Sequence, residues 1–286
     1  MSAYAAPDER SNCHSFLPYG QIFGYFSLPR NRIFCVLNDG STVVYKTDGY
    51  GGRVFGSGGP DRVVVFGESQ ALGMDSNELP LVYRQLHATN AVLYATPNSG
   101  PLQNLARVKH GAFQKARRYV VIFNFGFDVF RLLPGWDSRK VNSQSIYEAE
   151  DLIESPRLFA LKSLWRGLWG EAVGLSGDNN AEMKAYFLRK KPKIEKALAI
   201  YLERILPEFT QQLGADSSTT LLVYPPYWDP QLKEPEIAAV YTQFVGDLRK
   251  KPGVEVRVVE FPRYFDAASM LRGDKRHFVW STPLKN

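Results

Sequence analysis

Short apolar runs alternate with amphipathic segments along most of the chain. The continuous apolar runs, each a candidate strand, are residues 63–66, 91–95, 119–125, 220–224 and 254–260. Helical periodicity lies between them at residues 102–116 and 237–250. Continuous apolar strands are typical of a sheet covered on both faces, and helical crossovers favour parallel strands. The pattern therefore predicts an α/β fold with a central, mostly parallel sheet.

The first part of the chain has a different pattern, which is rich in β-strand. Residues 32–37 and 41–47 flank Asn38-Asp39-Gly40, a strong turn signal, and together they predict a hairpin. The glycine-dense passage that follows lacks the GxxxxGK[ST] phosphate loop, so its glycines are interpreted as turns. We therefore divide the chain into a β-rich N-terminal extension, residues 1–60, and an α/β domain, residues 61–286.

A long interval of the α/β domain, residues 134–215, has no convincing strand and a mostly helical pattern. It contains Trp136, Trp165, Trp169 and a long helical stretch at residues 181–213. We interpret the interval as a helical insertion or cap over the strand ends. Aromatic residues at such spacing more often pack in a core than bind a ligand.

The overall composition is typical of a globular protein. The chain has 286 residues, of which 44% are hydrophobic and 22% charged, enough for one large domain or two small ones. No apolar run approaches the ~20 residues of a membrane helix, so no membrane span is predicted. The first residues lack a basic start followed by an apolar region, so we expect a cytoplasmic protein, or a periplasmic one if a signal peptide was removed.

The cysteines indicate the redox state of the protein, and the charge limits the classes of binding partner. Cys13 and Cys35 form no CxxC or zinc spacing, and two cysteines are too few for a disulfide scaffold, so both are expected to remain thiols. The formal net charge of +6 is compatible with binding of a polyanion, but the basic residues are spread widely along the sequence. Their one dense run, RKKPK at residues 189–193, is interpreted as a solvated helix face, which makes nucleic acid a disfavoured partner.

Ser69 directly follows the first predicted strand of the sheet, in the stretch DRVVVFGESQALGMD. In open α/β sheets, functional sites form at the carboxyl ends of strands. A serine at the start of a helix can be a nucleophile whose own N–H and helix dipole stabilise an oxyanion, or it can simply cap the helix. This segment alone leaves both interpretations open.

The C-terminal stretch LRGDKRHFVW favours the nucleophile. Asp274 precedes His277 by three residues, and positions three apart face the same side of a helical turn. The carboxylate can orient the imidazole, whose other nitrogen then deprotonates Ser69. Such a pair alone is common at surfaces, but its combination with a strand-Gly-x-Ser-helix pattern predicts a catalytic triad. Without an HExxH motif or a His/Cys cluster, no metal and no cofactor are predicted.

These blocks together resemble the SGNH (GDSL-type) hydrolase superfamily. GES at residues 67–69 resembles its first block, Gly-Asp-Ser, and DKRH at residues 274–277 resembles its last, Asp-x-x-His. NAVLYATPNSGPLQNL at residues 90–105 and VVIFNFGFDVFR at residues 120–131 resemble the second and third blocks. TDGYGGRV at residues 47–54 is similar to a lead-in of some bacterial members. The resemblance implies a flavodoxin-like, three-layer α/β/α fold over about residues 45–286.

The chain departs from the family at the residues that would stabilise an oxyanion. In the second block no glycine falls clearly at the expected position; Thr96 or Asn98 stands there, and Gly100 lies just beyond. In the third block Phe127 or Asp128 replaces the family's asparagine, and Asn124 lies nearby. One oxyanion donor is worth roughly 3–4 kcal/mol of transition-state stabilisation.

The resemblance therefore implies a triad with an oxyanion hole that is either compromised or rebuilt. Its candidate donors are Ser69, Asn98, Gly100 and Asn124. Glu68 replaces the aspartate of the first block, which is not the nucleophile. The α/β-hydrolase elbow Gly-x-Ser-x-Gly is a poorer match, because here the sequence reads GESQA and the acid lies only three residues from the histidine.

The resemblance implies ester chemistry through an acyl-enzyme. Water as the acceptor gives an esterase and a sugar hydroxyl gives an acyltransferase, and the sequence leaves both open. Similar bacterial members add acetyl groups to polysaccharides or remove them. The resemblance therefore implies an acylated carbohydrate or polysaccharide, with acetyl as the acyl group, as partner and, for transfer, an acyl donor. Trp136, Tyr227 and Trp228 would suit either sugar stacking or core packing. The alternative hypothesis is a catalytically weak SGNH-fold protein that binds or assembles glycan.

Overall fold

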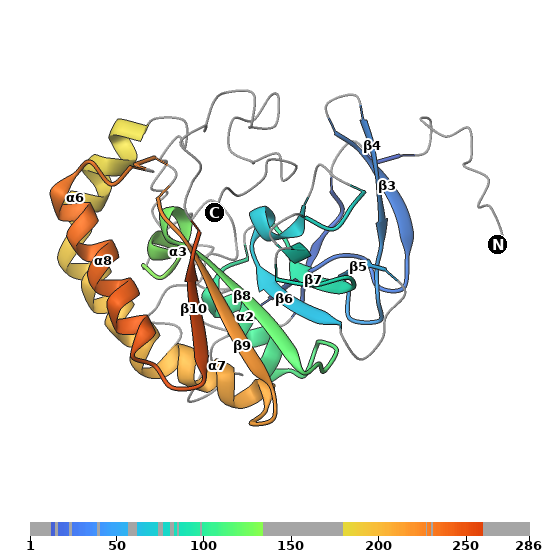
Figure 1. Cartoon of the computed structure of the whole chain (residues 1–286). Coiled ribbons are helices and arrows are strands. Elements are labelled where there is room, and N and C mark those ends of the chain that lie inside the picture. The colour runs from blue at the N-terminus through green and yellow to red at the C-terminus, as the bar shows by residue number, and fades with distance from the viewer. Residues whose placement is uncertain are drawn as a thin grey trace.

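A six-stranded sheet forms the centre of the molecule in the computed structural model (Figure 1). The structure describes residues 13–14, 17–22, 25–38, 41–56, 62–73, 77–80, 83–84, 86–97, 99–133, 180–226, 228–229 and 231–259. The strands of the sheet are β5 (Arg53–Phe55), β6 (Val63–Gly67), β7 (Ala91–Ala95), β8 (Arg118–Asn124), β9 (Ser218–Tyr224) and β10 (Val254–Val258). The five apolar runs of the sequence are therefore all strands, as predicted.

The strand order is β10-β9-β8-β6-β7-β5. Strands β6 to β10 are mutually parallel, and β5 adds to the edge beside β7 in the antiparallel direction. Numbered along the chain, the parallel strands follow the order 2-1-3-4-5, which is the flavodoxin-like order. This order confirms the predicted fold class.

The burial of each strand follows its place in the sheet. Every residue of β6 and β7 is buried, in agreement with their uninterrupted apolar sequences. The edge strand β10 has the sequence VEVRV, and its residues alternate between half-buried and exposed. The hydrophobic pattern of each strand thus reports whether neighbours cover one or both of its faces.

Helices cover one face of the sheet. They are α2 (Pro101–Lys109), α6 (Asn180–Ile200), the π-helical turn η3 (Tyr201–Ile205), α7 (Leu206–Leu213) and α8 (Pro235–Arg249). Their apolar side chains share one core cluster with alternate residues of the strands, including Val64, Phe66, Val121 and Phe123. Figure 1 shows α6, α7 and α8 together on one side of the strands.

The other residues of the same strands form a second core cluster with the N-terminal part of the chain. Val63, Val65 and Ile122 pack there with residues of β4 and of the short 3₁₀ helix η2 (Ser69–Leu72). Within the described residues, this face is covered by β-structure, η2 and the turn segment at residues 83–88. The N-terminal part therefore packs directly on the sheet that carries Ser69.

The N-terminal part contains two hairpins. The first pairs β1 (Gly20–Ile22) with β2 (Tyr25–Ser27), and the second pairs β3 (Ile33–Asn38) with β4 (Ser41–Lys46), as the Asn-Asp-Gly turn predicts. Strand β5 of the same region joins the central sheet. The division of the chain at residue 60 stays a prediction.

Part of the predicted insertion lies within the described residues. Residues 180–213 are helical, as predicted, and they connect β8 to β9 across the helical face. Residues 134–179, which include Trp136, Trp165 and Trp169, lie outside the described residues. The helix predicted at residues 102–116 is shorter, because α2 ends at Lys109 and Gly111 then adopts a left-handed conformation with a φ of 61°.

The prediction of free thiols is wrong, because Cys13 and Cys35 form a disulfide. The backbone brings them together: the His14 N–H donates to the Cys35 carbonyl, and the Leu37 N–H donates to the His14 carbonyl, each at 2.9 Å. These bonds place residue 13 beside β3, with 4.8 Å between the two cysteine Cα atoms. A spacing of 22 residues carries no such signal in the sequence.

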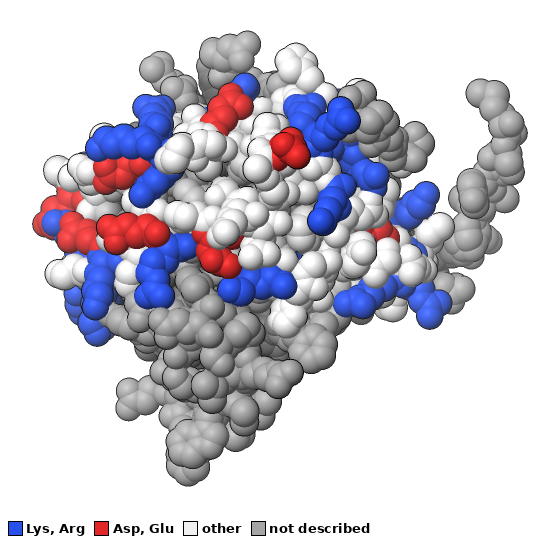
Figure 2. Space-filling model, turned by 90° about the horizontal axis from the view of Figure 1, so that it is seen from below, with Lys and Arg blue, Asp and Glu red and all other residues white. Residues whose placement is uncertain are grey.

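Two further expectations concern the surface of the molecule. In the described part of the chain, no helix is long and apolar enough to cross a membrane. Figure 2 shows a face on which acidic side chains lie among basic ones. In the basic run of α6, Lys191 lies 3.6 Å from Glu195 and 3.7 Å from Glu236, so acids accompany the bases.

Candidate functional site

The carboxyl ends of β6 and β8 lie side by side at the point where the strand order reverses. The chain runs outward from β6 to β7 in one direction, and from β8 to β9 and β10 in the other. Ligands of open α/β sheets bind at such switch points, beyond the carboxyl ends of the strands. Ser69 follows β6 and Asn124 ends β8, so both candidates lie at this edge.

Gly67 allows the sharp turn from β6 into η2. A Cβ atom at this position would lie 2.4 Å from the Ala71 Cβ and 3.3 Å from the Ile122 Cβ, so a side chain does not fit. The Ala71 N–H donates to the Glu68 carbonyl at 2.9 Å, which closes the first turn of η2. The turn places Ser69 at the start of η2, at the end of the strand.

Arg53 of β5 fixes the other end of η2. Its guanidinium is buried and donates to the carbonyls of Leu72, at 3.1 Å, and Gly73. It also packs over the rings of Tyr45 and Phe55, at 4.1 and 4.5 Å from the ring centroids. Strand β5, at the end of the glycine-rich lead-in, therefore fixes the position of the turn that carries Ser69.

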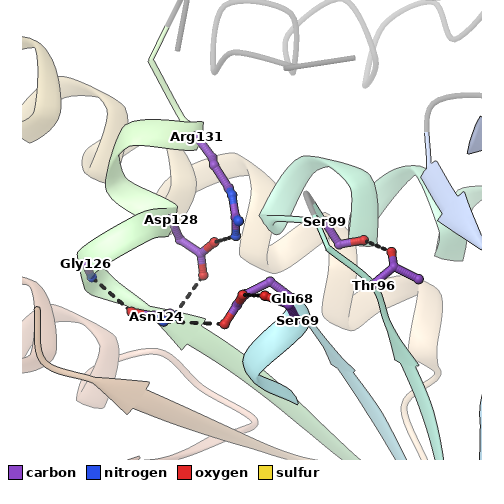
Figure 3. A network of polar contacts seen from close by, with 8 residues as sticks. All are labelled: Glu68, Ser69, Thr96, Ser99, Asn124, Gly126, Asp128 and Arg131. Carbon is purple, nitrogen blue, oxygen red and sulfur yellow. Dashed lines mark hydrogen bonds and ion pairs between the residues drawn. The ribbon is translucent and has the colours of Figure 1, made fainter. Parts of the chain in front are cut away.

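A buried carboxylate lies next to Ser69 (Figure 3). The Ser69 hydroxyl donates to Glu68 Oε2 at 2.7 Å, and the Asn124 side-chain amide donates to Glu68 Oε1 from 3.4 Å. Glu68 and Asn124 are each only 1% exposed, and Ser69 is 8% exposed. The strand ends of β6 and β8 are thus joined through one side chain.

The short helix α3 (Phe125–Arg131) continues this network from β8. Asn124 caps the helix, because its Oδ1 accepts a hydrogen bond from the Gly126 N–H at 3.2 Å. Its own backbone N–H donates to Asp128 Oδ2 at 2.8 Å, and Arg131 donates to Asp128 Oδ1 at 3.2 Å. The order Ser69–Glu68–Asn124–Asp128–Arg131 therefore forms a continuous polar chain (Figure 3).

Burial perturbs the ionisation of this network. Desolvation raises the pKa of the Asp128 carboxyl to about 7; the Arg131 guanidinium acts against the rise and the nearby charge of Glu68 adds to it. Burial also raises the pKa of the Tyr83 and Tyr224 hydroxyls, and the charge of Glu68 contributes to both rises. Both tyrosines therefore stay protonated around Glu68 at neutral pH.

The loop after β7 approaches the same edge. Gly100 precedes α2, and a Cβ atom there would lie 2.9 Å from the Arg131 Cδ, so the two residues are in close contact. Thr96 and Ser99 are buried and hydrogen-bonded to each other, with 2.7 Å between their hydroxyl oxygens. Figure 3 shows this pair on the β7 side, pointing toward each other rather than toward Ser69.

The structure brings some of the predicted site residues together, and others lie outside the residues that it describes. It brings Ser69 and Asn124 into one network and places Gly100 against Arg131. Asn98, Asp274 and His277 lie outside the described residues, so the triad stays a prediction. Of the alternatives in the third block, Asn124 is the residue whose amide reaches Glu68, whereas Asp128 bonds the Asn124 backbone.

Three members of the network are not predicted from the sequence: the carboxylates of Glu68 and Asp128 and the guanidinium of Arg131. Glu68 carries a weak signal, because an acid at the end of a wholly apolar strand is buried with it. Asp128 and Arg131 stand three positions apart, a spacing that favours an ion pair on a helix. Neither signal says that both acids accept hydrogen bonds from Asn124.

One aromatic candidate belongs to the core. Trp228 is 2% exposed, its indole N–H donates to the Gly126 carbonyl at 3.0 Å, and its ring packs against Phe130 and Phe187. It therefore packs in the core against α3 and is not available for sugar stacking. Trp136 and Tyr227 lie outside the described residues.

The described residues contain no group of three or more His, Cys, Asp or Glu side chains arranged to hold a metal ion. No protein-family model matches the chain, and no curated protein matches it. Among solved structures, it is similar to the lipase Lip_vut3 from a goat rumen metagenome. That likeness has a TM-score of 0.39 and 13% sequence identity, over 76% of this chain and 89% of the lipase.

Proposed function

We propose that this chain cleaves or transfers an acyl ester with Ser69 as its nucleophile. The observation that carries the proposal is the position of Ser69, at the switch point of a flavodoxin-like sheet, with the Asn124 amide held beside it through Glu68. A plain helix cap is less consistent with this arrangement, because the Ser69 hydroxyl donates to a carboxylate and η2 has no side-chain cap.

In the proposed reaction, Ser69 Oγ attacks the ester carbonyl carbon while its proton passes to His277, whose imidazole Asp274 orients. The carbonyl oxygen gains the negative charge, and the Ser69 N–H, the Asn124 amide and backbone near Asn98 and Gly100 donate to it. When the carbonyl re-forms, the C–O bond to the alcohol breaks and the alcohol takes the proton from His277. Water or a sugar hydroxyl then removes the acyl group by the same steps.

The proposal includes membership of the SGNH superfamily. The order of its sequence blocks from GES to DKRH supports this, together with a flavodoxin-like strand order. On the same ground we propose an O-acetylated carbohydrate as the substrate class, in the synthesis or modification of a bacterial polysaccharide. The Cys13–Cys35 disulfide favours an oxidising compartment such as the periplasm over the cytoplasm.

The second candidate function is glycan binding or assembly without turnover. One observation favours it: the Ser69 hydroxyl donates to Glu68, and the Asn124 amide donates to the same carboxylate, so both groups already have a partner. In this case Ser69 is not activated, and glycan binds without loss of its acyl groups.

A fluorophosphonate probe distinguishes the two functions. We expect the wild-type chain to be labelled at Ser69, as located by mass spectrometry, and Ser69→Ala and His277→Ala to lose the label. Ser217→Ala is the matched control, because Ser217 directly precedes β9, at the opposite end of the parallel strands from Ser69, and its hydroxyl donates to the Gly214 carbonyl. Absence of labelling in folded wild-type protein, with glycan binding retained, would establish the binding function instead.

A further inference from the structure

Glu68 is a single buried carboxylate with a different partner on each oxygen. Oε2 accepts from the Ser69 hydroxyl at 2.7 Å, and Oε1 accepts from Asn124 Nδ2 at 3.4 Å. Its side chain is 1% exposed, so within this site protein groups take the place that water would otherwise fill. One residue directly after β6 thereby sets the distance between the proposed nucleophile and a residue of β8.

The orientation of the Asn124 amide depends on this contact. Its Oδ1 accepts from the Gly126 N–H at 3.2 Å, which leaves Nδ2 facing Glu68. A rotated amide would place Oδ1 against a carboxylate and Nδ2 against an N–H donor, and both contacts are unfavourable. Nδ2 carries two N–H donors, and Glu68 takes one of them, so the second is available for a developing oxyanion.

The length and charge of Glu68 both matter to this geometry. Glutamine has one oxygen acceptor, so it cannot accept from Ser69 and from Asn124 with separate oxygens. Aspartate is shorter by one methylene, about 1.5 Å, so it cannot span the same gap without movement of the backbone. The change from the Asp of the Gly-Asp-Ser block to Glu68 is thus matched to the position of Asn124 on β8.

We propose that Glu68 is a positioning residue that aims both the Ser69 hydroxyl and the Asn124 amide at the reacting carbonyl. The inference rests on the proposed function. In the resting enzyme Ser69 donates to Glu68; during the reaction its proton passes to His277, and Glu68 keeps its bond to Asn124. Glu68 itself neither gains nor loses a proton in this sequence.

The first test measures the rate of fluorophosphonate labelling in Glu68→Gln and Glu68→Asp, with Glu78→Gln as the control because Glu78 is exposed. We expect Glu68→Gln and Glu68→Asp to be labelled ~10–100-fold more slowly, less than the ~100–1000-fold loss of a whole oxyanion donor. The control is expected to match the wild type. In an Asn124→Ala background the effect of Glu68→Gln should shrink, because the two residues act through one contact. Equal effects in both backgrounds would overturn the proposal.

The second test follows the Asn124 amide itself by ¹⁵N–¹H spectroscopy, with Asn124→Ala identifying its resonances. We expect the side-chain amide signals to move in Glu68→Gln and its proton exchange to accelerate, and neither to change in Glu78→Gln. Unchanged signals would overturn the proposal even if labelling slows, since the loss would then not act through Asn124. If the Asn124 signals move but the wild-type protein is never labelled, the contact between Glu68 and Asn124 is confirmed and the proposed function is rejected.

Discussion

Two of the buried acidic sites in the described part of the chain differ in how fully their carboxylates are hydrogen-bonded. The first surrounds Asp48 in the lead-in to the sheet. Asp48 Oδ1 accepts from the Tyr50 and Gly52 N–H groups, at 2.9 and 2.8 Å, and Oδ2 accepts from the Tyr94 hydroxyl and Gln114, at 2.6 and 2.8 Å. A carboxylate has about four acceptor positions, so this one is saturated.

The second cluster, at the switch point, is less complete. Glu68 accepts from Ser69 and, at a longer distance, from Asn124, while burial raises the pKa of the neighbouring Asp128 to about 7. Four donors from three parts of the chain hold Asp48 in place, as expected of a structural acid. Fewer donors leave Glu68 able to rearrange around a ligand and Asp128 able to bind a proton, as expected of a site.

The largest effect that this comparison predicts is on stability. Asp48→Ala leaves four donors without their acceptor beside the buried guanidinium of Arg107. We expect it to lower the free energy of unfolding by ~3–5 kcal/mol, because several buried donors lose their acceptor and a buried guanidinium loses a nearby opposite charge. Urea unfolding measures the change, with Asp216→Ala, an exposed turn residue, as the control. A loss under ~1 kcal/mol would contradict the structural role of this cluster.

The second prediction concerns pH and Asp128. Its pKa is about 7 in the folded state and near 3.8 when unfolded, so the folded state binds a proton that the unfolded state has released. This contribution to stability is complete below about pH 4 and is lost as the pH rises through about 7. We expect wild type to lose up to ~4 kcal/mol relative to Asp128→Asn across this window.

Urea unfolding at several pH values between 4 and 8 measures that difference. Glu68→Gln provides the internal check, because the charge of Glu68 contributes to the raised pKa of Asp128. Removing this charge should shift the window to lower pH. Stability curves of wild type and Asp128→Asn that stay parallel across the range would refute the buried, protonatable state of Asp128.

The smallest effect comes from the turn that carries Ser69. Gly67→Ala introduces a Cβ atom 2.4 Å from the Ala71 Cβ, so we expect a loss of ~1–3 kcal/mol in stability and slower labelling of Ser69. Gly246→Ala is the matched control, because its Cβ meets no atom within 4 Å and it lies inside α8. It should instead raise stability by ~0.5–1 kcal/mol. Similar changes in both variants would show that the turn imposes no special constraint.

Much of the fold can be predicted from local patterns. Continuous apolar runs predict the strands because a buried strand has to be apolar on both faces, and Asn-Asp-Gly predicts the β3–β4 hairpin because its residues tolerate the turn conformation. The exact end of α2 is harder, because the apolar pattern continues to residue 116 while Gly111 stops the helix. The disulfide is not predictable at all, since it depends on where the backbone brings residue 13.

The sequence by itself determined which segments form strands and that a serine and an asparagine stand at two strand ends. Only the tertiary structure decided that these ends meet. Strand β6 pairs with β8 in the register that sets Val63 opposite Arg118 and Phe66 opposite Val121, which brings Glu68 within hydrogen-bond reach of Asn124. The hydrophobic periodicity of a strand reports how much of each of its faces is buried. The contact between two residues 56 positions apart depends instead on strand register, a long-range property set by the packing of the whole sheet.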